Sequence, residues 1–225
     1  MRVVGLIPAR GGSESIPRKN LAPLVGRPLL AWTIDAARAA SSLEGFFVST
    51  EDDEIASAAL DHGADVLARP ANLASDDTPM LDVVLHAAAA LGDADVIALL
   101  QPTSPLRRAE HVDGAVRLLG DTGADGVVSV VRVAHRFSPE SLMRLEGGRL
   151  VALDPDGVTR RQDKQPLFAR NGPAVLVVTT EKLAERGLYG GDLRPYAMET
   201  RDSLDVDEPE DLELVEAILG SRVRG

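Results

Sequence analysis

A short loop near the start of the chain combines backbone flexibility with positive charge. Residues 7–20 read IPARGGSESIPRKN, in which Gly11 and Gly12 lie among three cations, Arg10, Arg18 and Lys19. The exposed amides of a glycine-rich turn form a nest for anions, and neighbouring cations add charge to it. Neither GxGxxG nor GxxxxGK(S/T) occurs here, and an ordinary turn is the alternative interpretation. The cation cluster, in a chain of formal charge −11, favours phosphate binding.

A pair of carboxylates near the end of the chain has the spacing of a metal site. Asp205 and Asp207 are two residues apart, so on an extended segment both side chains point to the same side. Two hard oxygen ligands placed in this way suit Mg²⁺, or Mn²⁺, bridging nucleotide phosphates. Asp207 could equally be the N-cap of a helix that begins at Glu208, with Pro209 in its first turn. Capping explains Asp207 but leaves Asp205 unexplained.

The composition limits the class of protein that carries these groups. The chain has 225 residues, is 44% hydrophobic and only 3% aromatic, and has no cysteine. Its negative charge argues against binding DNA or RNA. The lack of cysteine excludes disulfides and thiolate chemistry and makes the reducing cytoplasm the expected location. The run VVGLIPA is shorter than a signal-peptide core, and no stretch approaches the length of a membrane span, so we expect a soluble protein without membrane contact.

Strand and helix patterns alternate along the first 130 residues. Apolar runs predict strands at 3–8, 45–50, 64–68, 96–101 and 126–131. Helical spacing predicts helices at 28–40, 52–63, 79–91 and 109–120, with Ser49 or Thr50 as the N-cap of the second and Gly63 at its end. Continuous apolar strands separated by helices predict a doubly wound, Rossmann-like α/β fold with a mostly parallel sheet covered on both faces.

The alternation stops between residues 132 and 172. This segment has the turn sequences EGGR and DPDG and predicts short hairpins and loops outside the sheet, which we interpret as an arm for dimer formation. A last strand at 174–179 and a last helix at 208–220 return to the core. We therefore expect one domain over 1–225 with a small excursion at 132–172.

Five blocks in the same order resemble the acylneuraminate (CMP-sialic acid) cytidylyltransferase family, whose fold is that of the nucleotide-diphospho-sugar transferases. They are IPARGGSESIPRKN (7–20), RPANLASDDTP (69–79), LLQPTSPLR (99–107), RRQDKQPLFARNG (160–172) and SLDVDEPEDLE (203–213). The resemblance implies a CTP-dependent enzyme in which the hydroxyl of an acidic acceptor attacks the α-phosphorus and pyrophosphate leaves. It also implies a homodimer and a nucleotidyl transfer that depends on positioning and charge neutralisation.

The resemblance assigns roles on the donor side of the reaction. Arg10 and Lys19 would act as catalytic cations on the triphosphate and the leaving pyrophosphate. Asp205 and Asp207 would hold Mg²⁺, and Asp207 counts among the catalytic residues. Binding of the nucleotide would involve the loop residues, the stretch from Ser75 to Thr78 and two further side chains, those of Asn20 and Arg69. The full set is Gly11, Gly12, Ser13, Asn20, Arg69, Ser75 and Thr78. Without the resemblance, Arg69 is best explained as an ordinary surface charge at a strand end.

On the acceptor side, the resemblance implies roles for Gln101 at the end of a buried strand, for Arg107 nearby, and for Arg161 as the partner of the acceptor's carboxylate. Arg170 is a weaker candidate for that ion pair. A proline-rich strand exit capped by Thr103 or Ser104 is the alternative for the first block. A solvated run of charge is the alternative for the arginines.

Two departures from the family pattern bear on the acceptor. Glu14 stands where the family usually has Lys, and we expect it to turn away from the β- and γ-phosphates or to pair with Arg18. Val175 stands where sialate synthetases have an aromatic residue, so contacts to a nine-carbon sugar are altered. The expected acceptor is a 2-keto nonulosonic acid, with a small phosphonate or another acidic acceptor as the alternative. Transfer of another nucleotide to a sugar phosphate, or a catalytically impaired nucleotide-binding homologue, also stays open.

Overall fold

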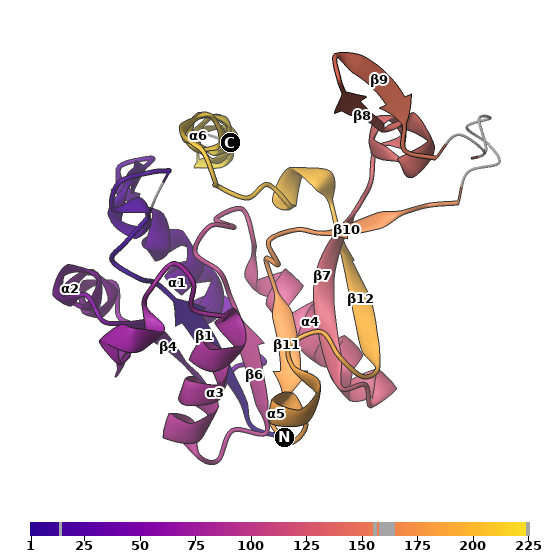
Figure 1. The fold of residues 1–225 in the computed structure, drawn as a ribbon. Coiled ribbons are helices and arrows are strands. Elements are labelled where there is room, and N and C mark those ends of the chain that lie inside the picture. Colours follow the sequence, from indigo (N-terminus) through magenta and orange to yellow (C-terminus); the bar gives the residue numbers. More distant parts are fainter. Residues whose placement is uncertain (14, 155–156, 158–164, 224–225) are drawn as a thin grey trace.

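A central sheet organises the chain in the computed structural model, which describes all residues except 14, 155–156, 158–164 and 224–225 (Figure 1). The strands run in the order β10-β7-β11-β6-β1-β4-β5, and β12 pairs with β7 beyond this path. Their bounds are β1 Val3–Pro8, β4 Gly45–Thr50, β5 Asp65–Ala68, β6 Val96–Leu99, β7 Gly126–Arg132, β10 Phe168–Arg170, β11 Leu176–Thr179 and β12 Leu193–Met198.

Most neighbouring strands of this sheet are parallel. β1 pairs in parallel with β4 and β6, β4 with β5, and β12 with β7, whereas β10 and β11 run antiparallel to their neighbours. The carboxyl ends of β1, β4, β5, β6 and β7 therefore meet at one edge, where ligands bind in folds of this type. The predicted doubly wound, mostly parallel sheet is confirmed.

Helices cover both faces of the sheet because successive strand residues point to opposite sides. Val3 and Ile7 pack with α1 (Leu29–Ala39), α2 (Asp53–Asp61) and α4 (Ala109–Thr122). Val4 and Leu6, from the same strand, pack with α3 (Met80–Leu91) and α5 (Leu183–Arg186) on the other face. Among the described helices, none has the length and apolar character that crossing a membrane requires.

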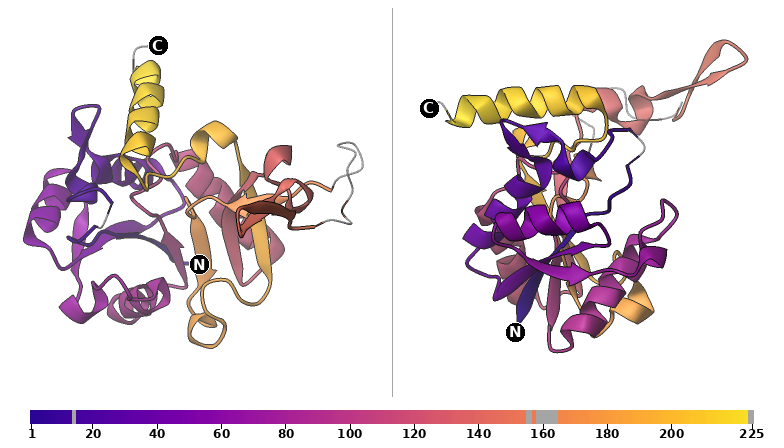
Figure 2. Two further views of the ribbon diagram at one scale, coloured as in Figure 1. Left: turned by 45° about the horizontal axis from the view of Figure 1, so that its top comes forward. Right: turned by 90° about the vertical axis from the view of Figure 1, so that its left-hand side faces the viewer.

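The last helix, α6 (Pro209–Val223), lies above the carboxyl edge of the sheet rather than on either face (Figures 1 and 2). Buried Val215 and Leu219 from α6 pack with Ile16 and Leu24 from the segment that follows β1. Two short strands of that segment, β2 (Pro23–Leu24) and β3 (Arg27–Pro28), pair with each other. This third apolar cluster joins the two ends of the chain above the carboxyl edge of the sheet.

A two-stranded hairpin projects from the body of the molecule (Figure 2). It consists of β8 (Met143–Glu146) and β9 (Arg149–Ala152), joined by Gly147 and Gly148, whose φ angles are +54° and +79°. Glycine accommodates such angles without steric cost, so the predicted EGGR turn is confirmed. Part of the predicted DPDG turn lies outside the described residues.

The predicted N-cap of α2 was wrong. The N-cap of α2 is Asp52, whose carboxylate accepts a hydrogen bond from the Ile55 amide at 2.9 Å, and neither Ser49 nor Thr50 fills this position. At the start of α6, the carboxylate of Asp211 accepts hydrogen bonds from the amides of Asp207 and Glu208, at 3.0 and 2.9 Å. Gly63, with φ of +73°, follows α2 as predicted.

Short 3-10 helices occupy several of the connections. Their bounds are Lys19–Leu21, Ala71–Leu73, His135–Phe137, Pro139–Ser141 and Thr200–Asp202.

Candidate functional site

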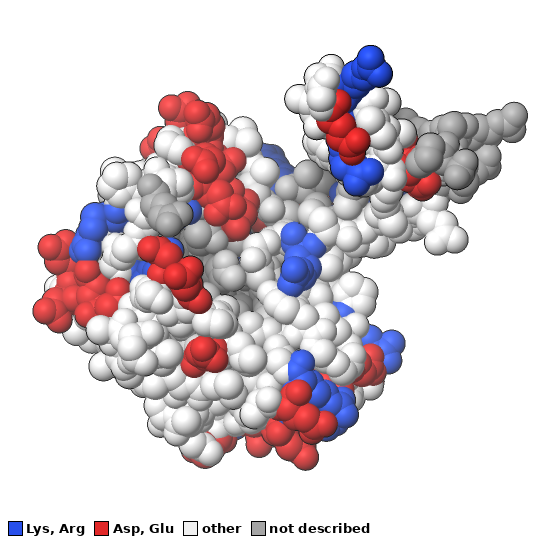
Figure 3. All heavy atoms as spheres, viewed as in Figure 1, with Lys and Arg blue, Asp and Glu red and all other residues white. Residues whose placement is uncertain are grey.

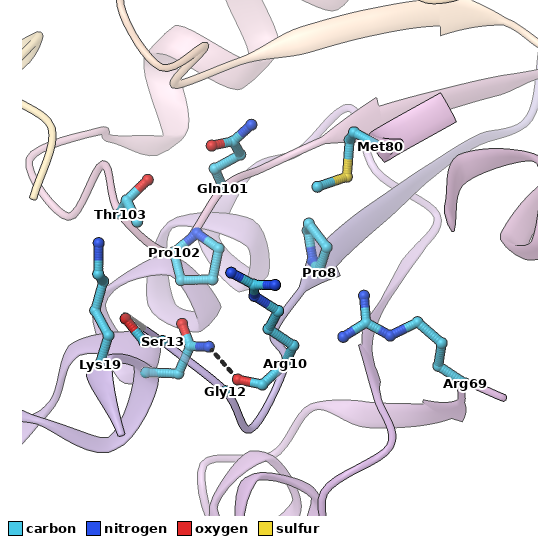
Figure 4. A pocket seen from close by; sticks show the side chains of 11 residues that line it. Pro8, Arg10, Gly12, Ser13, Lys19, Arg69, Met80, Gln101, Pro102 and Thr103 are labelled. Carbon is cyan, nitrogen blue, oxygen red and sulfur yellow. Dashed lines mark hydrogen bonds between the residues drawn. The ribbon is translucent and has the colours of Figure 1, made fainter. Parts of the chain in front are cut away.

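A cavity of about 190 Å³ opens at the carboxyl edge of the sheet (Figure 4). It lies where the loops after β1, β5 and β6 meet, close to the start of α3. Figure 4 shows Lys19 and Thr103 on one side, Arg69 on the opposite side and Arg10 between them. The cavity thus brings together many of the predicted site residues, its lining being Pro8, Arg10, Gly12, Ser13, Lys19, Asn20, Arg69, Met80, Gln101, Pro102 and Thr103.

The loop after β1 is held by contacts that fix its path. The amide of Gly11 donates to Glu51 Oε1 at 2.8 Å, and the side-chain amide of Asn20 donates to the Arg10 carbonyl at 2.9 Å, the bond drawn in Figure 4. A Cβ on Gly11 would lie 2.5 Å from Asp52 Oδ2, so only glycine fits against that carboxylate. A Cβ on Gly12 would meet nothing within 4 Å. The close approach of Asp52 therefore requires glycine at position 11, whereas no steric contact requires it at position 12.

Each cation of this region lies against a carboxylate from another segment. Arg10 Nη1 lies 2.6 Å from Asp76 Oδ1, and Arg69 Nη2 donates to Glu51 Oε2 at 2.9 Å. Arg69 is buried, whereas Asp76 is exposed. Glu51 therefore holds both the amide of Gly11 in the loop and the guanidinium of Arg69, which lies across the cavity from the loop.

Arg18 points away from the cavity lining and pairs with α2. Its guanidinium donates to both carboxylate oxygens of Asp52, at 2.5 and 3.0 Å, and to Glu54 at 2.7 Å. This hydrogen bonding lowers the pKa of Asp52 and raises the pKa of Arg18. Glu14 lies outside the described residues, so its predicted orientation and its pairing with Arg18 stay predictions.

Lys19 connects the loop to the two carboxylates near the end of the chain. Its ammonium donates to the carbonyls of Val206 and Asp207, at 3.0 and 3.2 Å, and lies 3.6 Å from Asp207 Oδ1. Asp205 accepts a hydrogen bond from Ser104 Oγ at 3.0 Å. Burial raises the pKa of Asp205, and the hydroxyls of Thr103 and Ser104 partly oppose this rise.

The two carboxylates suit a metal that takes most of its ligands from a substrate. Within the part of the chain that the structure describes, no group of three or more histidine, cysteine or acidic side chains is arranged around one point. Mg²⁺ is commonly held by one or two carboxylates together with water and substrate phosphates. Asp205 and Asp207 fit this pattern. The described residues do not offer enough ligands for a metal held by protein groups alone.

The remaining predicted donor-side residues lie near the cavity without lining it. The hydroxyls of Ser75 and Thr78 lie 2.8 Å apart in the loop before α3. This loop also carries Asp76, the partner of Arg10. Sequence reasoning missed Glu51, Asp52 and Asp76; the signal for the first two was their place directly after the strand at 45–50, whose carboxyl end reaches the same edge.

The predicted acceptor residues are distributed differently. Gln101 lines the cavity, whereas the Arg107 guanidinium is buried and donates to the carbonyls of Gln101 and Ala174. Arg161 lies outside the described residues. Arg170 is exposed and stacks on the Tyr189 ring at 4.1 Å.

Val175 lies in the core and not at the acceptor side. Its side chain is fully buried in the cluster that α1 and α4 form with the sheet. Valine at this position therefore contributes to the packing of the core. Just before it, buried Asn171 accepts from Ser129 Oγ at 2.6 Å and donates to Ser203 Oγ at 3.0 Å, which ties β7 to the segment that carries Asp205.

The sequence matches the family model described as cytidylyltransferase over residues 4–223. The chain belongs to the cytidylyltransferase family. This confirms the family resemblance of the five sequence blocks.

Named relatives agree with this membership. The chain is 34% identical to an N-acylneuraminate cytidylyltransferase of Oncorhynchus mykiss over 91% of its length and 47% of that protein. It is 31% identical to one of Escherichia coli, over 95% of its length and 51% of that protein. The chain thus spans about half the length of these relatives. A CMP-N,N'-diacetyllegionaminic acid synthase of Legionella pneumophila is 31% identical, with 97% of both chains covered.

Solved structures share the fold of this cytidylyltransferase family member. A CMP:2-keto-3-deoxy-manno-octonic acid synthetase complexed with CTP has a TM-score of 0.76 at 17% identity, with 99% of this chain and all of that chain covered. A cytidylyltransferase of Leptospira borgpetersenii has a TM-score of 0.62 at 18% identity. At these identities the likeness concerns the fold alone.

Proposed function

We propose that this protein transfers the cytidylyl group of CTP to an acidic sugar, a 2-keto nonulosonic acid, and releases pyrophosphate. One observation carries the proposal: the cavity cations Arg10 and Lys19 belong to the same loop, and Lys19 reaches the carboxylate of Asp207. This joins an anion-binding loop to a pair of metal-ligand carboxylates. The family and its relatives that form CMP-sugar acids support this choice of donor and acceptor.

The reaction needs an in-line displacement at phosphorus. A hydroxyl oxygen of the acceptor forms a bond to the α-phosphorus, the bond from that phosphorus to the bridging oxygen breaks, and the hydroxyl proton passes to solvent. Arg10, Lys19 and the amides of the loop bind the triphosphate and neutralise the charge that develops on the leaving pyrophosphate. Asp205 and Asp207 would hold Mg²⁺, or Mn²⁺, which when bound supplies charge neutralisation at the phosphates.

The remaining cavity residues orient the two substrates. Asn20, in the loop, and Arg69, across the cavity, would position the nucleotide, with the segment of Ser75 and Thr78 nearby. Gln101, at the exit of β6, would hydrogen-bond the acceptor. Arg161 is proposed to bind the acceptor's carboxylate, on the strength of the family resemblance.

The experiment is release of pyrophosphate with purified protein, Mg²⁺ and CTP, ATP, GTP or UTP. Acceptors are a panel of 2-keto sugar acids and small phosphonates. We expect release with CTP and a nonulosonic acid only. Lys19→Ala and Asp205→Ala should lower turnover by at least about a hundredfold, as loss of a charge-stabilising group does. Arg117→Ala, an exposed arginine of α4, is the matched control and should keep full turnover.

Four outcomes would overturn parts of the proposal. Turnover with another nucleotide would remove the assignment of the base, and turnover with a phosphonate alone would change the acceptor. CTP binding without pyrophosphate release for any acceptor would indicate a catalytically impaired homologue. Unchanged turnover in Lys19→Ala would remove the site assignment.

We also propose a cytoplasmic homodimer formed through the arm. Leu145 and Leu150 of the hairpin are 74% and 68% exposed, and Phe168 at its base is 51% exposed. Apolar side chains gathered on one projecting hairpin are typical of an interface. Sedimentation velocity should give a dimer for the wild type and a monomer for Leu145→Glu. The control Leu60→Glu, at an exposed position of α2, should stay dimeric. A monomeric wild type would refute this.

A further inference from the structure

A buried arginine lies directly behind the wall of the cavity. Arg107 leaves only 3% of its surface exposed, although it carries a charge and five N–H donors. Its Nη1 group donates to the carbonyl of Gln101 at 3.0 Å and to that of Ala174 at 2.7 Å. Its Nε and Nη2 groups are buried without a hydrogen-bond partner in the described part of the chain. Such a group is costly to bury, and packing alone does not explain its presence.

The two carbonyls belong to segments that form the site. Gln101 lines the cavity at the exit of β6, and Ala174 follows Gly172, whose backbone packs on the carboxylate of Asp205. A Cβ on Gly172 would lie 3.0 Å from Ser104 Oγ and 3.3 Å from both oxygens of Asp205. The arginine therefore connects the acceptor-side wall with the segment that packs against Asp205.

The carboxylate of Asp205 acts electrostatically on the buried charge of Arg107. Burial lowers the pKa of Arg107 to about 9, and the negative charge of Asp205 raises it. At neutral pH the guanidinium therefore stays protonated. The negative charge of Asp205 favours the charged form of Arg107.

We infer that Arg107 is a positioning residue that fixes Gln101 and the Gly172–Ala174 segment around Asp205, and so sets the geometry of the metal-binding carboxylates and the acceptor side. It acts through these groups and does not touch substrate. The inference rests on the proposed function only for the identity of the ligands. An arginine suits the role because its guanidinium keeps its charge when buried, whereas the pKa of a lysine falls readily on burial, and because Nη1 alone donates to both carbonyls.

The test uses Arg107→Met, Arg107→Lys and the control Arg117→Met in the full-length protein. The first readout is CTP binding by titration calorimetry, without metal and over a range of Mg²⁺ concentrations. The second is the half-saturation for Mg²⁺, the KM for the acceptor and kcat in pyrophosphate release. Calorimetric stoichiometry reports the folded, binding-competent fraction of each variant.

For Arg107→Met we expect the Mg²⁺ half-saturation and the acceptor KM to rise at least about tenfold, as loss of an outer partner of a metal ligand does. Affinity for CTP without metal should change less than about threefold, since the donor loop is untouched. Arg107→Lys should fall between wild type and Arg107→Met. Arg117→Met should match wild type.

A merely structural role would lower the binding stoichiometry and leave the Mg²⁺ half-saturation of the remaining protein unchanged, and that result would overturn the inference. Equal effects of Arg107→Met on CTP affinity with and without metal would also overturn it. If wild type binds CTP with Mg²⁺ but releases no pyrophosphate, the proposed function fails. The metal dependence of CTP binding still decides the role of Arg107 in that case.

Discussion

The two adjacent glycines of the β1 loop should respond in opposite ways to the same substitution. A methyl group on Gly11 would collide with Asp52, at 2.5 Å from Oδ2 and 3.1 Å from both Cβ and Cγ. Rotating the carboxylate alone leaves the contact with Cβ, so either Asp52 or the loop must move. A methyl group on Gly12 would meet no atom within 4 Å.

The magnitude follows from what Asp52 and the loop hold. Moving Asp52 removes the N-cap of α2, which costs about 1 kcal/mol. Moving the loop disturbs the hydrogen bond from the Gly11 amide to Glu51, which adds about 1 kcal/mol. For a chain of this size, about 2 kcal/mol lowers Tm by roughly 4–8 °C. Gly12→Ala should leave Tm unchanged or slightly higher, because alanine restricts the unfolded chain.

Thermal unfolding followed by circular dichroism measures both variants under one condition. Asp52→Ala gives a further control, since the penalty of Gly11→Ala should shrink in the double variant that lacks the carboxylate. A melting temperature of Gly11→Ala within about 1 °C of wild type would refute the steric argument, because that is the range of a neutral surface change. An equal loss in Gly12→Ala would refute it as well.

Three other substitutions test contacts around the site and the sheet. Glu51→Gln leaves the buried guanidinium beside it with an uncharged partner, and urea denaturation should show a loss of about 2 kcal/mol. Burial lowers the pKa of His111, so its contribution to stability is complete above the unfolded value of about 6.5 and is lost as pH falls from there through the lowered pKa of the folded state. His111→Gln should flatten the stability–pH curve below about pH 6.5, and an unchanged slope would contradict this. Gly114→Ala would place a methyl group 2.6 Å from the Tyr196 ring and should lower the free energy of unfolding, measured by urea denaturation, by about 1–3 kcal/mol. The control Gly120→Ala, whose methyl group would meet nothing within 4 Å, should lower it far less.

The core elements of the fold were predictable because their apolar patterns are strong. The buried strands at the centre of the sheet and the helices α1 to α4 match the expected ranges within a few residues. The strand β12 was not predicted, since it contains Pro195 and most of its residues are exposed or half-buried. It forms a strand because β7 offers an edge to pair with, which is a property of the folded sheet. The antiparallel direction of β11 also depends on the chain path, because its apolar run resembles that of a parallel strand.

The cations of the site were predictable and their partners were not. Arg10, Lys19 and Gln101 follow strands whose carboxyl ends share one edge, so their convergence follows from the predicted topology. Asp76 lies eight residues after the end of β5, in a connection whose path no local pattern determines. Arg107 ends a motif that predicts ligand binding, and only the packing around it reveals that its donors point inward.

The cation–carboxylate pairs divide the cavity into a fixed part and an exchangeable part. On the face shown in Figure 3, acidic side chains gather over α2 and α6. Arg69 and Glu51 are 3% and 20% exposed, and separating them would leave a buried charge without a partner. Arg10 and Asp76 are 32% and 58% exposed, and such a pair contributes little to stability. A triphosphate can therefore replace Asp76 beside Arg10 at small cost, whereas Arg69 stays bound to Glu51. Of these two arginines, we expect Arg10 to contact the phosphates and Arg69 to hold the wall against which the nucleotide lies.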